Sequence, residues 1–227
     1  MYLPNYHALT ERDALWALID AHPLGAWVSA CADGLVANHV PWVLDRTQGA
    51  HGTLIGHVAR GNPVWRQLAD GAPAVVMFTA AQAYISPGWY PGKATHGKVV
   101  PTWNYAVAHA HGTARAVQDR SWLLDMLQRL THAQEAGRAA PWQVQDAPAD
   151  YIDKLLGAIV GIEIPIERLE GRNKASQDEA LEDRQGTVLG LHAAGGEQQR
   201  AVARQVVQAL AAEGHAVSGG LDGIFKP

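Results

Sequence analysis

The sequence predicts a mainly β protein with flanking helices, in the form of an antiparallel barrel or sandwich. Six apolar runs bounded by turn residues read as strands; they cover residues 26–30, 35–44, 53–58, 74–84, 102–117 and 159–169. Helical patterns do not alternate regularly with these runs, which argues against a doubly wound parallel sheet.

The first elements are marked by local signals. Residues 10–13, Thr-Glu-Arg-Asp, have the pattern of a capping box, and Leu15 and Ile19 then share one helical face, so we expect a first helix that ends near Pro23. Asp33-Gly34, between the first two runs, is a two-residue hairpin signal because glycine accepts a positive φ.

Helical patterns return after the fifth strand. We expect a helical insertion at about 121–157, with Ser121 as the cap of its first helix and Pro148 at the start of its second. The Gly195-Gly196 pair marks a boundary. The expected parts are a domain over residues 1–191, a helix over 197–213 and a loose tail over 214–227.

Composition limits the class of protein. The chain has 227 residues, 48% of them hydrophobic, which suffices for one sizeable core or two small ones. It has no apolar run long enough to cross a bilayer, and its one cysteine permits no internal disulfide, so we expect a cytoplasmic protein. The net charge of −4 makes direct DNA binding unlikely.

Several catalytic classes lack their motifs. There is no Gly-x-Ser-x-Gly elbow, no Gly-x-Gly-x-x-Gly after a strand and no Walker loop. Nucleophilic hydrolases, dinucleotide-binding folds and P-loop enzymes are therefore disfavoured, and no catalytic side chain is predicted.

The strand at 104–112 has two different faces. Alternation places Tyr105, His109 and His111 on one face and three alanines on the other, which leaves room for a packed helix or for a flat ring. The two histidines could contribute to a metal site, but two ligands do not make one, so no metal is predicted.

Three further stretches offer polar groups. Arg60, at the end of a strand before an Asn-Pro turn, could hold a phosphate or simply lie on the surface. His39 and His57 could each donate to a phosphate or to a flavin carbonyl. Residues 174–177, Lys-Ala-Ser-Gln, follow a strand with an ammonium, a hydroxyl and an amide.

Seven short blocks occur in order along the chain: MYLP at 1–4, NHVP at 38–41, GHVARGNPVW at 56–65, AYISPGWY at 83–90, VPTWNY at 100–105, IVGIEI at 159–164 and NKASQD at 173–178. Their combination is highly specific, and in it the chain resembles, over residues 1 to about 191, the PaiB family of FMN-binding negative transcriptional regulators. In the last block, Ala175 and Asp178 stand where the family pattern has Leu and Asn.

This resemblance implies a split β-barrel, similar to that of pyridoxamine-phosphate oxidase and the flavin reductases, and a homodimer with FMN at the subunit interface. The site residues that it implies form three groups. His39, His57, Arg60 and Asn62 would hold the phosphate; Trp89, Tyr90, Trp103 and Tyr105 would wall the ring, with Thr102 and Asn104 at its rim; Lys174, Ser176 and Gln177 would come from the partner chain.

The resemblance leaves several functions open. The leading one is a regulator that acts indirectly, since nothing in the residues shows how this chain would bind DNA. The alternatives are a flavin-dependent oxidoreductase and a haem-binding protein with His39, His57 or His109 as the axial ligand. The aromatic residues of 83–105 are either a rigid wall for a cofactor or second subunit, or plugs of a small barrel.

Overall fold

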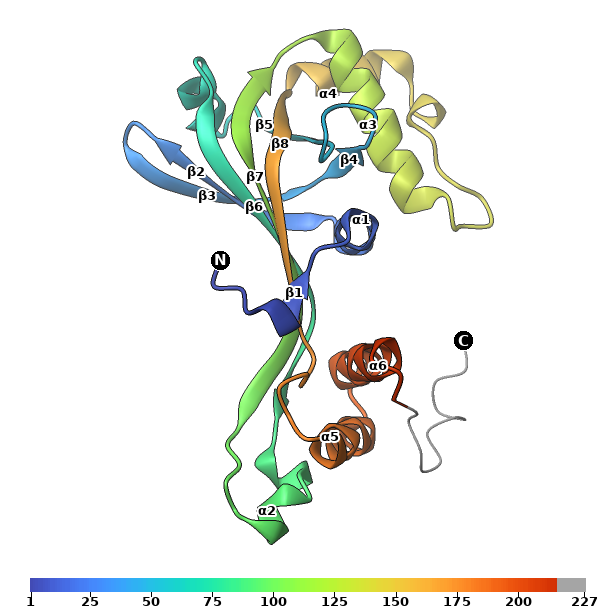
Figure 1. Ribbon diagram of the computed structural model, residues 1–227. Helices are drawn as coiled ribbons and strands as arrows, with labels where there is room; N and C mark the ends of the chain where they lie inside the picture. The colour runs from blue at the N-terminus through green and yellow to red at the C-terminus, as the bar shows by residue number, and fades with distance from the viewer. Residues whose placement is uncertain (216–227) are drawn as a thin grey trace. The chain divides into compact units, whose positions relative to one another are not determined.

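The computed structural model describes residues 1–215 and contains one curled antiparallel sheet with helices beside it (Figure 1). The strands run in the order β3-β2-β6-β7-β8-β5-β4, and β1 pairs with β8. Their bounds are β1 Ala8–Leu9, β2 Leu24–Cys31, β3 Gly34–Pro41, β4 Val43–Asp45, β5 Thr53–Ala59, β6 Ala72–Ile85, β7 Thr102–Val117 and β8 Ile159–Lys174.

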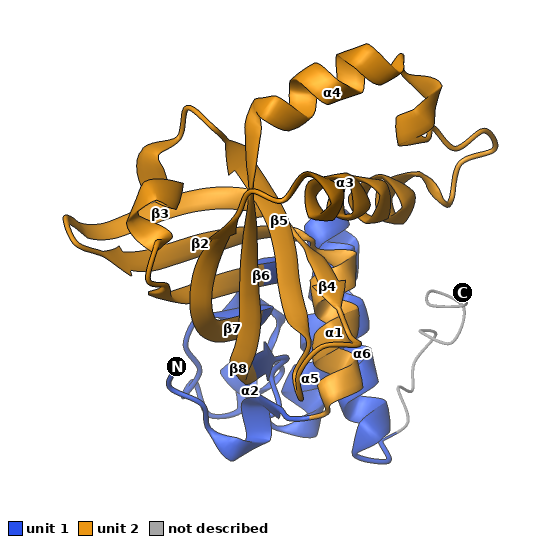
Figure 2. Ribbon diagram, turned by 90° about the horizontal axis from the view of Figure 1, so that it is seen from above, with its two compact units in different colours: residues 1–10, 79–107, 171–227 blue, residues 11–78, 108–170 orange. Residues whose placement is uncertain are grey.

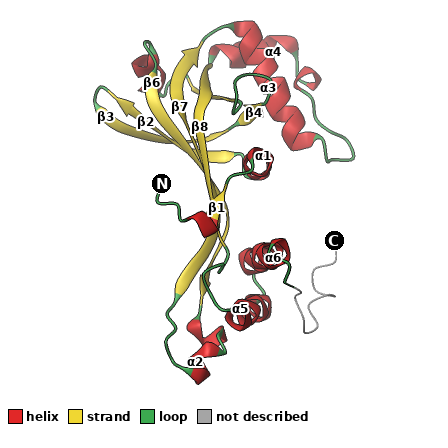
Figure 3. Ribbon diagram, viewed as in Figure 1, coloured by secondary structure: helices red, strands yellow, loops and turns green. Residues whose placement is uncertain are grey.

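The helices lie before, between and after these strands (Figure 3). The α-helices are α1 Arg12–Ala21, α2 Gly92–Thr95, α3 Arg120–Glu135, α4 Ala149–Gly157, α5 Leu181–Ala194 and α6 Glu197–Ala212. Short 3-10 helices are η1 Asn5–His7, η2 Pro63–Leu68, η3 Pro87–Trp89 and η4 Val144–Asp146. None of the described helices is long and apolar enough to span a membrane.

Figure 2 shows that the chain divides into two compact units that interleave in sequence. Unit 1 contains residues 1–10, 79–107 and 171–227, and unit 2 contains residues 11–78 and 108–170. Strands β6, β7 and β8 each contribute residues to both units. The tail predicted for 214–227 lies, after residue 215, outside the described residues.

In unit 2, the run predicted as one strand over 35–44 is two strands. β3 pairs with β2, whereas β4 pairs with β5, so the chain changes partner at the buried Trp42. The Trp42 ring occupies the space that side chains at Gly25 and Gly56 would fill, since a Cβ at either position would lie 3.0 Å from it. Two glycines therefore make this corner possible.

The helices of unit 2 pack on the end of its sheet that holds β4 and β5. Leu123 and Met126 of α3 and Leu156 of α4 form a buried cluster with Ile55 of β5. The N-cap of α3 is Asp119, whose carboxylate accepts from the Trp122 amide at 2.8 Å, so the prediction of Ser121 as the cap is wrong. The predicted capping box of α1 is also absent, because its N-cap residue, Glu11, makes no side-chain cap bond.

Unit 1 has its own core, built on a helix pair that contains one unpredicted helix. α5 and α6 pack against each other, and Val188, Leu191 and Val206 are fully buried between them and the 81–90 segment. Gly195 ends α5 with φ 73°, and Gly196 caps α6, so this pair is a tight turn between packed helices. α5 escaped sequence analysis because its two interior glycines lower its helix propensity.

Candidate functional site

The predicted site residues fall into two groups, one in each unit. Unit 2 holds the four that were expected at the phosphate, His39, His57, Arg60 and Asn62. Unit 1 holds the other seven: Trp89, Thr102, Trp103, Asn104, Lys174, Ser176 and Gln177.

Arg60 fastens the end of β5 to the start of β8. Its Nε donates to the Gly157 carbonyl at 2.8 Å, its Nη2 to the Ile159 carbonyl at 2.9 Å and its Nη1 to the Gln118 amide oxygen at 2.9 Å. A guanidinium has five N–H donors, so two remain for an anion. The three hydrogen bonds to the protein thus give Arg60 a structural role that requires no ligand.

The other residues of this group are spread over three elements. The Asn62 side chain caps η2 by accepting from the Val64 amide at 3.1 Å and donates to Asn38 at 2.7 Å. His57 is partly buried in β5, and this burial lowers the pKa of its imidazole, which favours the neutral form at pH 7. His39 is exposed on β3.

In unit 1 the structure brings together two of the predicted stretches that lie 72 residues apart. The Lys174 ammonium of β8 contacts the Thr102 hydroxyl of β7 in a short hydrogen bond. Next to it, the Asn104 amide donates to the Ser176 hydroxyl at 2.8 Å. Because Asn104 and Ser176 are 0% and 1% exposed, they position this site, whereas the partly exposed Lys174 and Thr102 can meet a ligand.

The turn after β8 is held in an unusual conformation. Ser176 has φ 61°, the only positive φ of a non-glycine residue in the described part of the chain. Gln177 stabilises the turn, since its amide oxygen accepts from the Ala175 N–H at 2.7 Å and its amide nitrogen donates to the Asn173 carbonyl at 2.7 Å. Such conformations persist only where surrounding contacts enforce them, and they are frequent at binding sites.

An exposed aromatic pair includes the residue that follows Thr102 along β7. Trp103 follows Thr102 on β7 and meets Tyr84 of β6 edge to face, with ring centroids 6.1 Å apart. The two residues are 53% and 48% exposed. Sequence analysis predicted Trp103 but missed Tyr84, although the latter lies in the same aromatic block.

The Pro-bracketed part of that block has a different environment. Tyr90 is 3% exposed within the core of unit 1, and burial, followed by the nearby Glu179 carboxylate, raises the pKa of its hydroxyl to about 12. Trp89 packs on α5, where a Cβ at Gly190 would lie 2.2 Å from its ring and one at Gly186 would lie 2.1 Å from its carbonyl oxygen. These rings fix α5, and only part of Trp89 is left for other contacts.

Arg172, a second cation on β8, was not among the predicted site residues. It donates to the Tyr2 carbonyl at 3.2 Å and lies 5.5 Å from the Tyr105 ring and 3.3 Å from His7 Nδ1. His7 is 2% exposed, and burial is the main cause that lowers its imidazole pKa. Tyr105 thus lies against an arginine of the same unit. Arg172 and Lys174 are two residues apart on β8, and this spacing could have indicated from the sequence that both cations belong to the site.

The histidine pair of β7 does not form a metal centre in the described residues. His109 and His111 have ring centroids 6.3 Å apart, and His111 Nε2 lies 3.2 Å from a Glu170 carboxylate oxygen. Among residues 1–215, no group of three His, Cys, Asp or Glu side chains could hold a metal ion. The alanines on the opposite face of the strand are buried, as the packing interpretation predicts.

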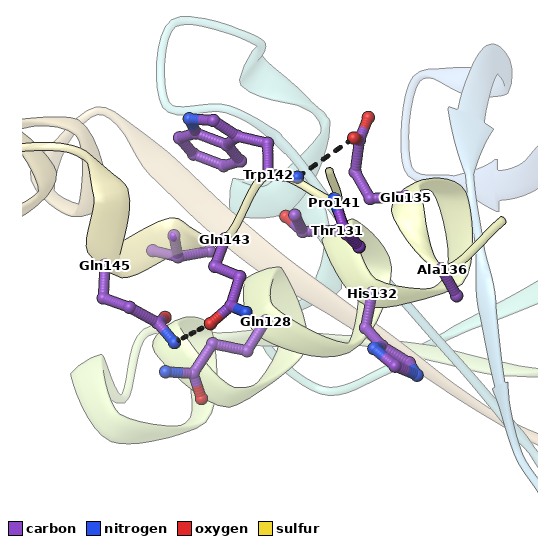
Figure 4. Close-up of a pocket in the computed structure, with 10 residues that line it drawn as sticks. Gln128, Thr131, His132, Glu135, Ala136, Pro141, Trp142, Gln143 and Gln145 are labelled. Atoms are coloured by element: carbon purple, nitrogen blue, oxygen red, sulfur yellow. Dashed lines mark hydrogen bonds between the residues drawn. The ribbon is translucent and has the colours of Figure 1, made fainter. Parts of the chain in front are cut away.

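The cavities described in unit 2 lie elsewhere. One of about 470 Å³ is bounded by α3 and the segment 141–145, with Gln128, Glu135 and Trp142 around it (Figure 4). A larger one of about 710 Å³ lies between α3 and α4. None of the eleven predicted residues lines these cavities.

The chain is similar to proteins of known sequence and structure. Residues 1–168 match a family described as "Putative FMN-binding domain". An uncharacterized protein of Emericella nidulans is 33% identical, over 91% of this chain and 96% of that protein, and the protease synthase and sporulation protein PAI 2 of Bacillus subtilis is 29% identical, over 78% and 83%. The structure of an FAD and haem binding protein from Mycobacterium smegmatis superposes with a TM-score of 0.57 at 24% identity, over 84% of this chain and 80% of that one.

These findings confirm the predicted fold and cofactor class. The structural likeness identifies the curled sheet with its flanking helices as a split barrel. The motifs that carried the resemblance lie within the matched residues, except for the last block at 173–178. By the match over residues 1–168 and the relative at 33% identity, this chain belongs to the FMN-binding family to which PAI 2 is related, and FMN is its cofactor.

Proposed function

We propose that this chain is a cytoplasmic FMN-binding homodimer of the PaiB type, and that FMN lies against the exposed face of β6, β7 and β8 in unit 1. The observation that carries the proposal is that Trp103, of the exposed Tyr84–Trp103 pair, directly follows Thr102, the partner of Lys174, along β7. Exposed aromatic rings at the same end of the strands as a cation and a hydroxyl suit a ligand with a planar ring system and an anionic group.

The residues of this face fit the flavin by their chemistry. The indole of Trp103 and the phenol of Tyr84 offer aromatic surface to the isoalloxazine, while Lys174 offers an ammonium to an anionic oxygen of the cofactor. The buried Asn104–Ser176 bond keeps Thr102 and Lys174 on adjacent strands in a fixed relation. Bound FMN supplies electron transfer, so no acid or base side chain of this chain is required.

A second copy of the chain would explain the exposed rings. Large aromatic groups gathered on one face are typical of surfaces that a partner covers. In such a dimer, one copy would hold the cofactor phosphate and the other copy would contribute residues 174–177 to the same cofactor. The residues expected at the phosphate are His39, His57, Arg60 and Asn62. With a net charge of −4, any effect on transcription would be indirect.

Binding of FMN and riboflavin to variants tests the site. Lys174→Ala should weaken FMN about tenfold, as expected for the loss of a charge-assisted contact, and riboflavin less if the ammonium meets the phosphate. Trp103→Ala should weaken both ligands. Lys98→Ala is the matched control, because Lys98 is exposed in unit 1 and its charge is not paired in the described structure. Equal affinities of wild type and both site variants would refute this placement.

Arg60→Ala separates two roles of that residue. A phosphate role predicts weaker FMN binding with riboflavin binding unchanged, whereas the three bonds to the protein predict mainly a lower melting temperature.

Light scattering on the wild-type protein measures its mass in solution. A monomer at micromolar concentration would refute the dimer.

Redox activity and haem binding are tested on the same protein. Bleaching of the flavin by a reduced nicotinamide, with recovery in oxygen, would favour an oxidoreductase over a regulator without turnover. A Soret band after haem addition, lost in one variant among His39→Ala, His57→Ala and His109→Ala, would favour the haem alternative.

A further inference from the structure

We propose that unit 2 contains an anion site that none of the predicted residues forms, suited to a small hydroxyl-bearing organic phosphate. The site is a cavity of about 470 Å³ between η2, the turn after it and the end of β7. Its wall includes Trp65, Arg66, Asp70, Arg115 and Gln118. A bare phosphate ion would fill only a small part of this volume, which leaves room for an organic portion of the ligand.

Two unpaired cations face this cavity. The guanidinium groups of Arg66 and Arg115 make no ion pair or hydrogen bond within the described chain, although an acid, Asp70, lies on the same wall. Other arginines of unit 2, such as Arg120 and Arg129, are paired with carboxylates. Two guanidinium groups on one concave wall, each with all its N–H donors available, are the arrangement that binds phosphate oxygens.

The wall also holds its polar groups in place. The Arg66 guanidinium lies over the Trp65 ring, 5.1 Å from its centroid, and the Trp65 indole donates to the Arg60 carbonyl at 3.0 Å. The Gln118 oxygen accepts from Arg60 at 2.9 Å, which leaves the Gln118 amide N–H groups as donors. Arg60 thus orients one side of the cavity, a role that differs from a direct grip on the ligand.

Asp70 sets the class of anion. Its carboxylate repels a second phosphate on the same ligand but can accept hydrogen bonds from hydroxyl groups. The cavity therefore suits a monophosphate with neighbouring hydroxyls better than a polyphosphate. Two sources have this chemistry: a free sugar phosphate, and the ribityl phosphate end of FMN. The second source rests on the proposed function, and the first does not.

Calorimetric titration with ribose 5-phosphate, before and after saturation with FMN, tests the site. Arg66→Ala and Arg115→Ala should each weaken binding about five- to tenfold, whereas Asp70→Asn should strengthen it, because it removes a like charge. Arg204→Ala is the control, since Arg204 is exposed on α6 in unit 1 and has no ion pair within the described chain. Higher salt should weaken the wild-type affinity.

The outcomes distinguish the two sources. Binding of ribose 5-phosphate that survives FMN saturation supports a separate sugar-phosphate site. Displacement by FMN, together with a loss of FMN but not riboflavin affinity in Arg115→Ala, supports the cofactor's own phosphate end. If FMN fails to bind at all, the sugar-phosphate titration still reports on this cavity. No binding of either phosphate to wild type, or the same affinity in all variants, would overturn the inference.

Discussion

Replacing Asp45 by asparagine should destabilise unit 2 in a pH-dependent way. Asp45 ends β4 at 5% exposure, and its carboxylate accepts from the Thr47 hydroxyl at 2.6 Å, the Thr47 amide at 2.9 Å and Arg129 of α3 at 2.9 Å. Burial by itself raises the pKa of this carboxyl, but the Thr47 and Arg129 bonds outweigh it and lower the pKa to about 2.

The size of the effect follows from linkage. A pKa of about 2 in the folded chain, against 3.8 for the free group, favours the charged folded form by about 2 kcal/mol, since one pKa unit is worth about 1.4 kcal/mol. Because the folded pKa is depressed, this stabilisation is fully present above the unfolded pKa. It falls to about half near pH 3 and is nearly gone near pH 2.

Urea unfolding followed by tryptophan fluorescence measures this contribution. Asp45→Asn should lower the free energy of unfolding by about 2 kcal/mol at pH 7 and by progressively less as the pH falls through 3. Asp70→Asn, at an exposed and unpaired aspartate of the same unit, should change stability by less than about 0.5 kcal/mol at any pH. A difference between wild type and Asp45→Asn that is the same at pH 7 and pH 3 would refute the reasoning.

Two further predictions concern packing and charge pairing in unit 1. Gly190→Ala should lower the free energy of unfolding by about 1 to 3 kcal/mol, because the new Cβ would lie 2.2 Å from the Trp89 ring. Gly157→Ala is the control and should be neutral, because a Cβ there would have nothing within 4 Å; equal melting temperatures for the two variants would contradict the packing argument. Glu213→Gln should cost about 1 to 3 kcal/mol, because it leaves the Arg184 guanidinium, 4% exposed, without its carboxylate, which it meets at 2.6 and 2.9 Å. Arg184 lowers the pKa of Glu213, so this contribution is present above the pKa of the unfolded group and is lost in acid; a pH-independent difference between the melting temperatures of wild type and variant would contradict it.

Some site residues could be found from sequence, but their roles could not. Short blocks identified Arg60, Trp89 and Lys174 as residues of interest. Their contacts depend on segments far away: Arg60 bonds to carbonyls 97 and 99 residues later, and Lys174 to a hydroxyl 72 residues earlier. The sequence carries no direct record of such pairs, so a structural clamp and a ligand contact look alike in it.

The chain's own order of residues determined the strand-rich fold, the Asp33-Gly34 hairpin and four of the helices, because these depend on periodicity and turn chemistry within a few residues. Only the tertiary structure decided that β3 and β4 separate at Trp42, that α5 forms despite its glycines, and which cations remain unpaired. The physical reason is the same in each case. Packing of a large ring against a glycine, and pairing of a charge across the fold, are interactions between distant residues, and they override local preference when enough surface is buried.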